Sequence, residues 1–188
     1  ALYGRNAIGG AIIINTKQPT DFLEGSVVAG IDNGFGWYLR GGLSGPLSDN
    51  VKFRIAGMHK DTDGYIPNAF LGEDADPYQD TALRGNLLFD LGGGLEIDLR
   101  ASMDLLRTQA LYFNIVSDVN DTSLPVRVNN AGQNDRDIYN FSGKVSYEGN
   151  DFSITSITSY DTLEEVLTGD AFDFLPIEES LFYNILGF

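Results

Sequence analysis

The chain has 188 residues, contains no cysteine and carries a formal net charge of −15 at pH 7. The missing cysteines exclude a disulfide framework and any thiolate nucleophile or metal ligand. The acidic balance argues against nucleic acid as a partner, because binding to phosphate backbones needs a basic face. The 22 glycines and the 12% of aromatic residues favour a β protein with many turns. No run approaches the roughly 18 apolar residues that a transmembrane helix requires, which leaves a membrane β-barrel open.

The first predicted element is a short strand near the start of the chain. The run from Ala11 to Thr16 is apolar and rich in β-branched residues, which is typical of a buried strand. Gly4, Gly9 and Gly10 precede it and allow tight turns. Pro19 lacks the backbone N–H that a strand ladder needs, so we expect the strand to end there.

Beyond Pro19 the chain alternates between apolar and polar residues, as in strands that have one apolar and one polar face. The predicted strands are 25–31, 37–44, 51–56, 83–89, 95–105, 139–147 and 152–160. The segment 95–105 is the cleanest, because a helix would scatter its apolar residues around the whole circumference. Five basic residues of these strands fall on the polar face: Lys52, Arg54, Arg84, Arg100 and Lys144.

The connections between the predicted strands differ in length at the two ends. The short ones lie near 45–50, 91–94 and 148–151. The long acidic ones lie near 61–80, 107–136 and 161–179, with one exception on that side, the Asn-Gly turn at 32–34. Short turns at one end and long loops at the other are typical of outer-membrane barrels.

Aromatic residues are predicted to mark both ends of the apolar face. Trp37, Tyr139 and Tyr160 fall near the long loops, Phe89, Tyr147 and Phe152 fall near the short turns, and Phe141 is an exception in the middle. Two aromatic bands with aliphatic residues between them are typical of a lipid-facing barrel wall. Alternation alone fits a soluble antiparallel sandwich equally well. The loop asymmetry and the aromatic bands favour the membrane barrel.

The stretch from Leu2 to Pro19 resembles, nearly residue for residue, the closing segment of the plug domain in TonB-dependent outer-membrane receptors. The resemblance implies an all-β fold: an antiparallel meander that forms part of the wall of a large transmembrane β-barrel of about 22 strands. Residues 1–20 would end the plug, and 21–188 would hold the first seven or eight barrel strands. The tail 181–188 departs from this pattern because it barely alternates. The chain begins without methionine or a visible signal peptide, so we expect a fragment.

The resemblance also implies a function. A TonB-dependent receptor in the bacterial outer membrane is no enzyme; it binds and imports a scarce solute such as a ferric siderophore, cobalamin or an oligosaccharide. Its expected partners are TonB, through an N-terminal box outside this sequence, outer-membrane lipid and lipopolysaccharide, and a small-molecule ligand. Two other functions stay open: a small non-transport barrel or surface adhesin, and an extracellular β-sandwich hydrolase.

Candidate site residues follow from position. No catalytic site, cofactor or metal site is expected, because His59 is the only histidine and the acidic loops lack the calcium-binding pattern of EF-hands. The aromatic residues set among polar loop residues are candidates for ligand contact, with loop packing as the alternative: Tyr65, Tyr78, Tyr112 and Phe113. For the contact between plug and barrel, we expect Arg5 and Asn6 to meet carboxylates of the polar face, namely Glu96, Asp98 and Asp104.

Overall fold

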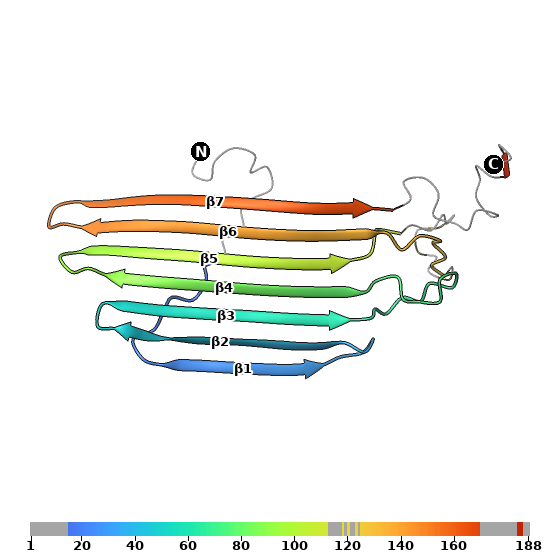
Figure 1. Ribbon diagram of the computed structural model, residues 1–188, viewed down its shortest axis with the longest axis horizontal. Coiled ribbons are helices and arrows are strands. Elements are labelled where there is room, and N and C mark those ends of the chain that lie inside the picture. The colour runs from blue at the N-terminus through green and yellow to red at the C-terminus, as the bar shows by residue number, and fades with distance from the viewer. Residues whose placement is uncertain are drawn as a thin grey trace.

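One antiparallel sheet accounts for nearly all of the regular structure. The computed structural model describes residues 15–112, 118, 120, 123, 125–169 and 184–185. The sheet has seven strands in the order of the sequence (Figure 1). They are β1 (Glu24–Ile31), β2 (Trp37–Ser48), β3 (Val51–Thr62), β4 (Tyr78–Asp90), β5 (Leu95–Thr108), β6 (Gln133–Glu148) and β7 (Ser153–Thr168). This architecture confirms the predicted all-β antiparallel meander.

The register of the strands collects the apolar residues on one face and the polar residues on the other. One row of paired residues across β2 to β7 consists of Leu43, Ile55, Gly85, Ala101, Phe141 and Tyr160. The adjacent row consists of Ser44, Arg54, Asn86, Arg100, Ser142 and Ser159. Successive residues of a strand point to opposite faces, so these two rows face opposite sides of the sheet. We call the two sides the apolar face and the polar face.

The apolar face is exposed in the described part of the chain. Val27 is 77% exposed and Phe141 is 53% exposed, and both belong to this face. The buried hydrophobic residues of the described chain are Ala75, Val126 and Val128, all of which lie in loops. A soluble sandwich would cover such a face with a second sheet, whereas the described residues form a single sheet. Among them, no helix has the length and apolar character needed to cross a membrane.

The two ends of the sheet carry connections of different length (Figure 1). The short turn after β4 contains Gly92, Gly93 and Gly94, whose φ angles of 74°, 61° and 84° favour glycine. The predicted turn at 45–50 is wrong in extent, because β2 continues to Ser48 and only Asp49 and Asn50 turn. β1 pairs with β2 only as far as Ser44, so the missing N–H of Pro46 costs no ladder bond on that side.

The strands also run further toward the long loops than the alternation predicts. β3 ends at Thr62, β4 begins at Tyr78 and β7 continues to Thr168, so the long loops are shorter than expected. The extra pairs carry polar residues on both faces; Asp61, for example, pairs with Gln79 on the same side as the apolar residues. Such residues look like loop in a pattern of alternation, but paired backbone groups need only a continuous ladder.

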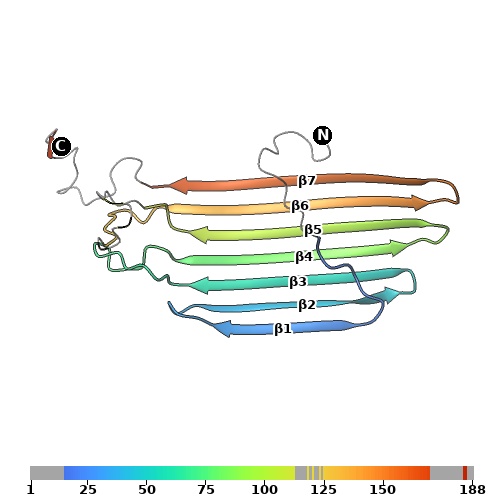
Figure 2. The same cartoon turned by 180° about the vertical axis from the view of Figure 1, so that it is seen from behind.

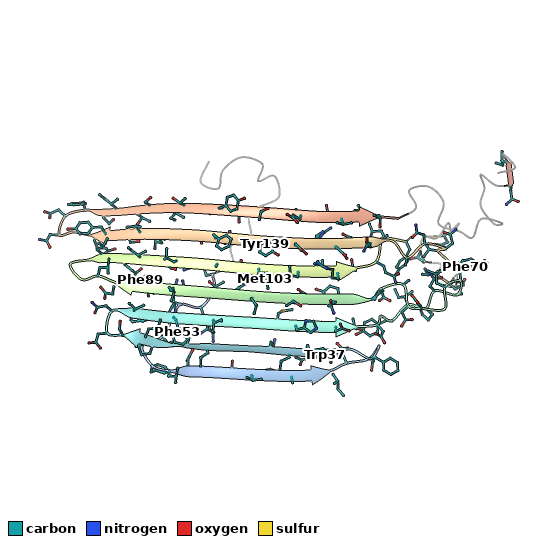
Figure 3. The ribbon with its side chains drawn as sticks, in the orientation of Figure 1. Trp37, Phe53, Phe70, Phe89, Met103 and Tyr139 are labelled. Carbon is teal, nitrogen blue, oxygen red and sulfur yellow. The ribbon has the colours of Figure 1, made fainter. Side chains whose placement is uncertain are left out.

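The aromatic side chains of the apolar face follow two oblique lines across the sheet. The row that contains Trp37 crosses β5 at Arg107, whereas the row of Tyr139 crosses β5 at Met103, closer to the short turns. Tyr160 pairs with Phe141, which lies two residues closer to the short turns than Tyr139. Figure 3 shows Trp37 near the long-loop end and Tyr139 and Met103 nearer the middle of their strands.

The second line lies nearer the short turns and descends in the same direction. Phe53 lies one apolar row further from the short turns than Phe89. Tyr147 and then Phe152 lie progressively closer to those turns. Figure 3 shows Phe53 and Phe89 near the short-turn end. Two parallel oblique lines are expected when strands are inclined to a common axis, because groups at one height then fall on successive rows.

The residues before β1 lie against the polar face. We call residues 15–23 the leading segment. The backbone N–H and the hydroxyl of Thr20 donate to the Ser44 hydroxyl of β2 at 3.0 and 2.9 Å, and Arg100 of β5 donates to the hydroxyl of Thr16 at 3.4 Å. Lys52 of β3 forms an ion pair with Asp21. The segment therefore crosses several strands on one side of the sheet (Figure 2).

Candidate functional site

Three arginines lie side by side at the centre of the polar face. Arg54, Arg84 and Arg100 come from the neighbouring strands β3, β4 and β5. The row of Arg54 passes through Asn86 to Arg100, and Arg84 occupies the adjacent polar row opposite Ala56 and Ser102. Each arginine was placed on this face by alternation within its own strand, but only the register between strands makes them neighbours.

Asp98 holds Arg100 in a fixed orientation. The guanidinium donates to the two carboxylate oxygens from Nε at 3.0 and 3.2 Å and from Nη2 at 2.6 Å. Asp98 is 4% exposed, and it also accepts a hydrogen bond from Asn86. Lys144 is the residue paired with Asp98 on β6. Two cations therefore come from positions next to this one carboxylate, and Arg100 is the one that forms an ion pair with it.

Substitution of Asp98 by asparagine should therefore loosen Arg100 while preserving the shape of the side chain. We expect Asp98→Asn to lower the free energy of unfolding by about 1.5–3 kcal/mol, the range for hydrogen bonds to charged groups, because Arg100 loses its ionic partner. Urea unfolding of the full-length protein in lipid vesicles measures this change. Glu96→Gln is the matched control, because Glu96 lies on the same face of β5 and is exposed. Equal losses in both variants would contradict the assignment.

A hollow of about 530 Å³ lies between the leading segment and the centre of the polar face. Its charged lining consists of Lys17 from the leading segment and the three central arginines. Asn140 of β6 and Asn86 of β4 add amide groups, and no carboxylate of the described residues belongs to the lining. The chemistry of this lining favours an anionic group with several oxygen atoms, because guanidinium groups present parallel N–H donors.

The two long loops pack against each other into a unit that we call the loop cap, comprising the described residues of 63–77 and 109–132. Its core consists of Ala75, Val126 and Val128, with Tyr112 packed against them. Short bridges pair Pro67 with Asp74 within one loop and Asn68 with Val126 between the loops. The loop cap is thus held by its own small core at the end of the sheet (Figure 3, around Phe70).

Asn68 is the central polar residue of the loop cap. It is 2% exposed and its side chain donates to the carbonyl of Val128 at 2.9 Å. Its amide oxygen accepts from the backbone N–H groups of Phe70 at 3.0 Å and Leu71 at 3.3 Å. One side chain therefore joins the two loops and shapes the tip of the first loop. In the sequence, Asn68 has the appearance of an ordinary solvated loop residue.

The predicted ligand-contact residues occupy three different settings. Tyr65 is 52% exposed in the first loop. Tyr78 begins β4 and donates its hydroxyl to Asp80 at 3.0 Å. Tyr112 packs in the loop cap, where burial and then the nearby charge of Asp76 raise the pKa of its phenol. Phe113 lies outside the described residues. Contact of these residues with a ligand stays a prediction.

Some of the residues predicted to join plug and barrel lie outside the described chain, and the others lie on one strand. Arg5 and Asn6 lie outside the described residues. Glu96, Asp98 and Asp104 all lie on the polar face of β5, as the alternation predicts. Of these, Asp98 already forms an ion pair with Arg100. Contact with Arg5 or Asn6 stays a prediction.

Asp76, one of the acidic residues of the first loop, has a structural role in the described chain. One carboxylate oxygen of Asp76 accepts from the backbone N–H groups of Tyr65 and Ile66, both at 2.8 Å. Among the described residues, no three side chains of His, Asp or Glu come together as metal ligands. The carboxylate of Asp76 therefore shapes the loop from within.

Comparison with known proteins includes a partial similarity to a receptor. Over 90 residues, the chain is 34% identical to the ferric enterobactin receptor PirA of Pseudomonas aeruginosa. The aligned part is 45% of this chain and 12% of that receptor, so the chain spans a small part of its relative's length. No family model matches the chain. No solved structure matches it either.

Proposed function

We propose that the chain is part of a TonB-dependent outer-membrane receptor that imports a scarce solute, with a ferric siderophore as the favoured class. Residues 1–20 would end the plug domain, and 21–188 would include the first barrel strands, seven of which are described. TonB would be the partner on the inner side, and lipid and lipopolysaccharide would surround the wall. The chain would have no enzymatic activity of its own.

The observation that carries this proposal is the opposite treatment of the two faces of one sheet. The apolar face carries large exposed side chains, whereas the leading segment lies on the polar face and binds it through Thr16, Thr20 and Asp21. A barrel wall around a plug needs this arrangement, with lipid outside and protein inside. A soluble protein would gain nothing from exposing its apolar face.

The spacing of the two aromatic lines supports a membrane of ordinary thickness. Tyr139 and Tyr147 are eight residues apart on β6, as are Tyr160 and Phe152 at β7. At about 3.3 Å per residue this spans about 26 Å along the strand. A tilt of about 40° reduces it to about 20 Å of height, close to the apolar band of about 25 Å in outer-membrane barrels.

The substrate class rests on the similarity to the ferric enterobactin receptor. Uptake of radioactive iron as ferric enterobactin, measured in cells that express the full-length protein and in a deletion strain, tests it. We expect uptake of iron as ferric enterobactin in the expressing cells and its loss in the deletion strain. A protonophore should also stop this uptake, because import needs energy from the inner membrane. Cobalamin uptake, measured in parallel, is the control for a general loss of transport.

Several outcomes would overturn the proposal. Uptake that is unchanged by the deletion for iron, cobalamin and oligosaccharides would leave the non-transport barrel as the better reading. Loss of cobalamin uptake alone would retain the receptor and replace the siderophore. Full-length protein that stays monodisperse without detergent would contradict the membrane location itself.

A further inference from the structure

The charges around the hollow on the polar face do not balance. Arg54 has Glu24 as a partner at 3.4 Å, and Arg100 has Asp98 at 2.6 Å. Lys17 and Arg84 form no ion pair with any of the described residues. The charge of Arg84 acts on Asp104 of β5, which lies outside the lining of the hollow. Lys17 and Arg84 therefore line the hollow without an ion pair to any described carboxylate.

The sequence that precedes the leading segment carries no negatively charged side chain. Residues 1–14 contain no Asp or Glu, and their one charged side chain is Arg5. This stretch therefore brings no carboxylate that could pair with Lys17 or Arg84.

Several features of the hollow prepare it for an anion. Asp98 fixes the guanidinium of Arg100, so little conformational entropy is lost when that group binds. Ser44 is fully buried and ties the leading segment to the wall, which keeps Lys17 and the arginines on opposite sides of one space. Cations that line a concave, partly enclosed space also concentrate anions from the surrounding water.

We propose that this hollow is a binding site for the anionic oxygen groups of a solute, with Arg84 as its free cation and Arg54, Arg100 and Lys17 around it. The site lies on the middle of the wall, beside the leading segment, away from the loop cap. This inference rests on the proposed function, because it takes the polar face as the enclosed side of the barrel. It narrows the imported solute to one that carries carboxylate, phosphate or similar anionic groups.

Chemical modification of arginine tests the site directly. Full-length receptor in lipid vesicles is treated with phenylglyoxal, and the rate of modification of each arginine is followed by mass spectrometry. Inorganic phosphate is the probe, and chloride at the same ionic strength is its control. We expect phosphate to slow modification of Arg84 about tenfold, because two charge-assisted hydrogen bonds would occupy the guanidinium. Arg136, which pairs with Glu165 on the same face of β6 but outside the hollow, should not change.

Two substitutions show whether the cluster acts together. Arg54→Gln and Lys17→Gln should each weaken the protection of Arg84 by phosphate, whereas Arg136→Gln should leave it unchanged. Lys17 lies outside the sheet, so its variant keeps the test valid if the loss of Arg54 prevents folding.

The outcomes separate this site from the proposed function. Equal protection of Arg84 by phosphate and chloride would overturn the site, and so would an Arg84 that is unreactive before phosphate is added, because a protein group would then fill the hollow. Neither result bears on the measurement of iron uptake, so the receptor assignment would stand. Conversely, phosphate protection in a protein whose deletion leaves uptake unchanged would keep the site and refute the transport assignment.

Discussion

Placing an arginine at Leu99 should lower the free energy of unfolding in lipid vesicles by about 2–4 kcal/mol, the cost of a cation on the lipid face at the middle of the bilayer. Leu99 lies on the apolar face of β5, between Leu87 of β4 and Gly143 of β6, and its side chain is exposed. On β5 it lies between the two aromatic lines. The Leu99→Arg change therefore measures whether lipid surrounds this face.

Thr155→Arg is the matched control for this measurement. Thr155 lies on the polar face of β7, pairs with Ser146 and is exposed. We expect a change within about 0.5 kcal/mol, as for a surface substitution, because the new cation would face the wet side of the wall. Equal costs for the two variants would show that the faces do not differ in their surroundings, and a larger cost at Thr155 would reverse their assignment.

The strands and their faces could be predicted from the sequence because alternation is a local property. In the segment 95–105, each side chain is assigned to a face by its position in the strand alone. The short turns were found for the same reason, since glycines such as Gly92 and Gly94 mark the backbone geometry directly. The end of β3, up to Thr62, and the start of β4, from Tyr78, are not predicted by alternation, because polar residues occupy both faces there.

The arrangement of the site could not be predicted, because it depends on register and on contacts between distant segments. Arg54, Arg84 and Arg100 were each placed on the polar face, but their proximity follows from pairings between three strands. A shift of one strand by two residues would keep every face and separate the cations. The hollow further requires the leading segment, which reaches Arg100 from 84 positions away in the sequence.

The loop cap is the part of the structure that is hardest to predict from composition. Its loops are acidic and rich in polar residues, which predicts solvated segments, and yet they share a small core around Val126. In the sequence, the residues of this core are a few apolar residues scattered among polar ones. They follow no period that would predict contact between the two loops. The buried side-chain amide of Asn68 donates across to the carbonyl of Val128 in the second loop and accepts from Phe70 in its own loop, and nothing in the sequence predicts these bonds.

Substituting Asn68 by alanine should open the loop cap without unfolding the sheet. The change leaves the carbonyl of Val128 and the N–H groups of Phe70 and Leu71 without their partner. An unsatisfied buried group costs about 1–3 kcal/mol. Because the tip at Phe70 is exposed and water can replace part of the loss, we expect local opening to become easier by about 2–4 kcal/mol.

Amide hydrogen exchange of the full-length protein measures this effect at the right place. The N–H of Ala69 donates to the backbone carbonyl of Val126, and that of Gly72 donates to the backbone carbonyl of Asn68. Both amides should exchange roughly a hundredfold faster in Asn68→Ala because the loop cap opens more easily, and every 1.4 kcal/mol is a factor of ten. Amides in the middle of β5 should keep their rates. Glu73→Ala is the control, because its exposed side chain lies in the same loop. If both variants exchange alike, the side chain of Asn68 does not hold the two loops together, and the apolar core and the backbone bonds between the loops are sufficient.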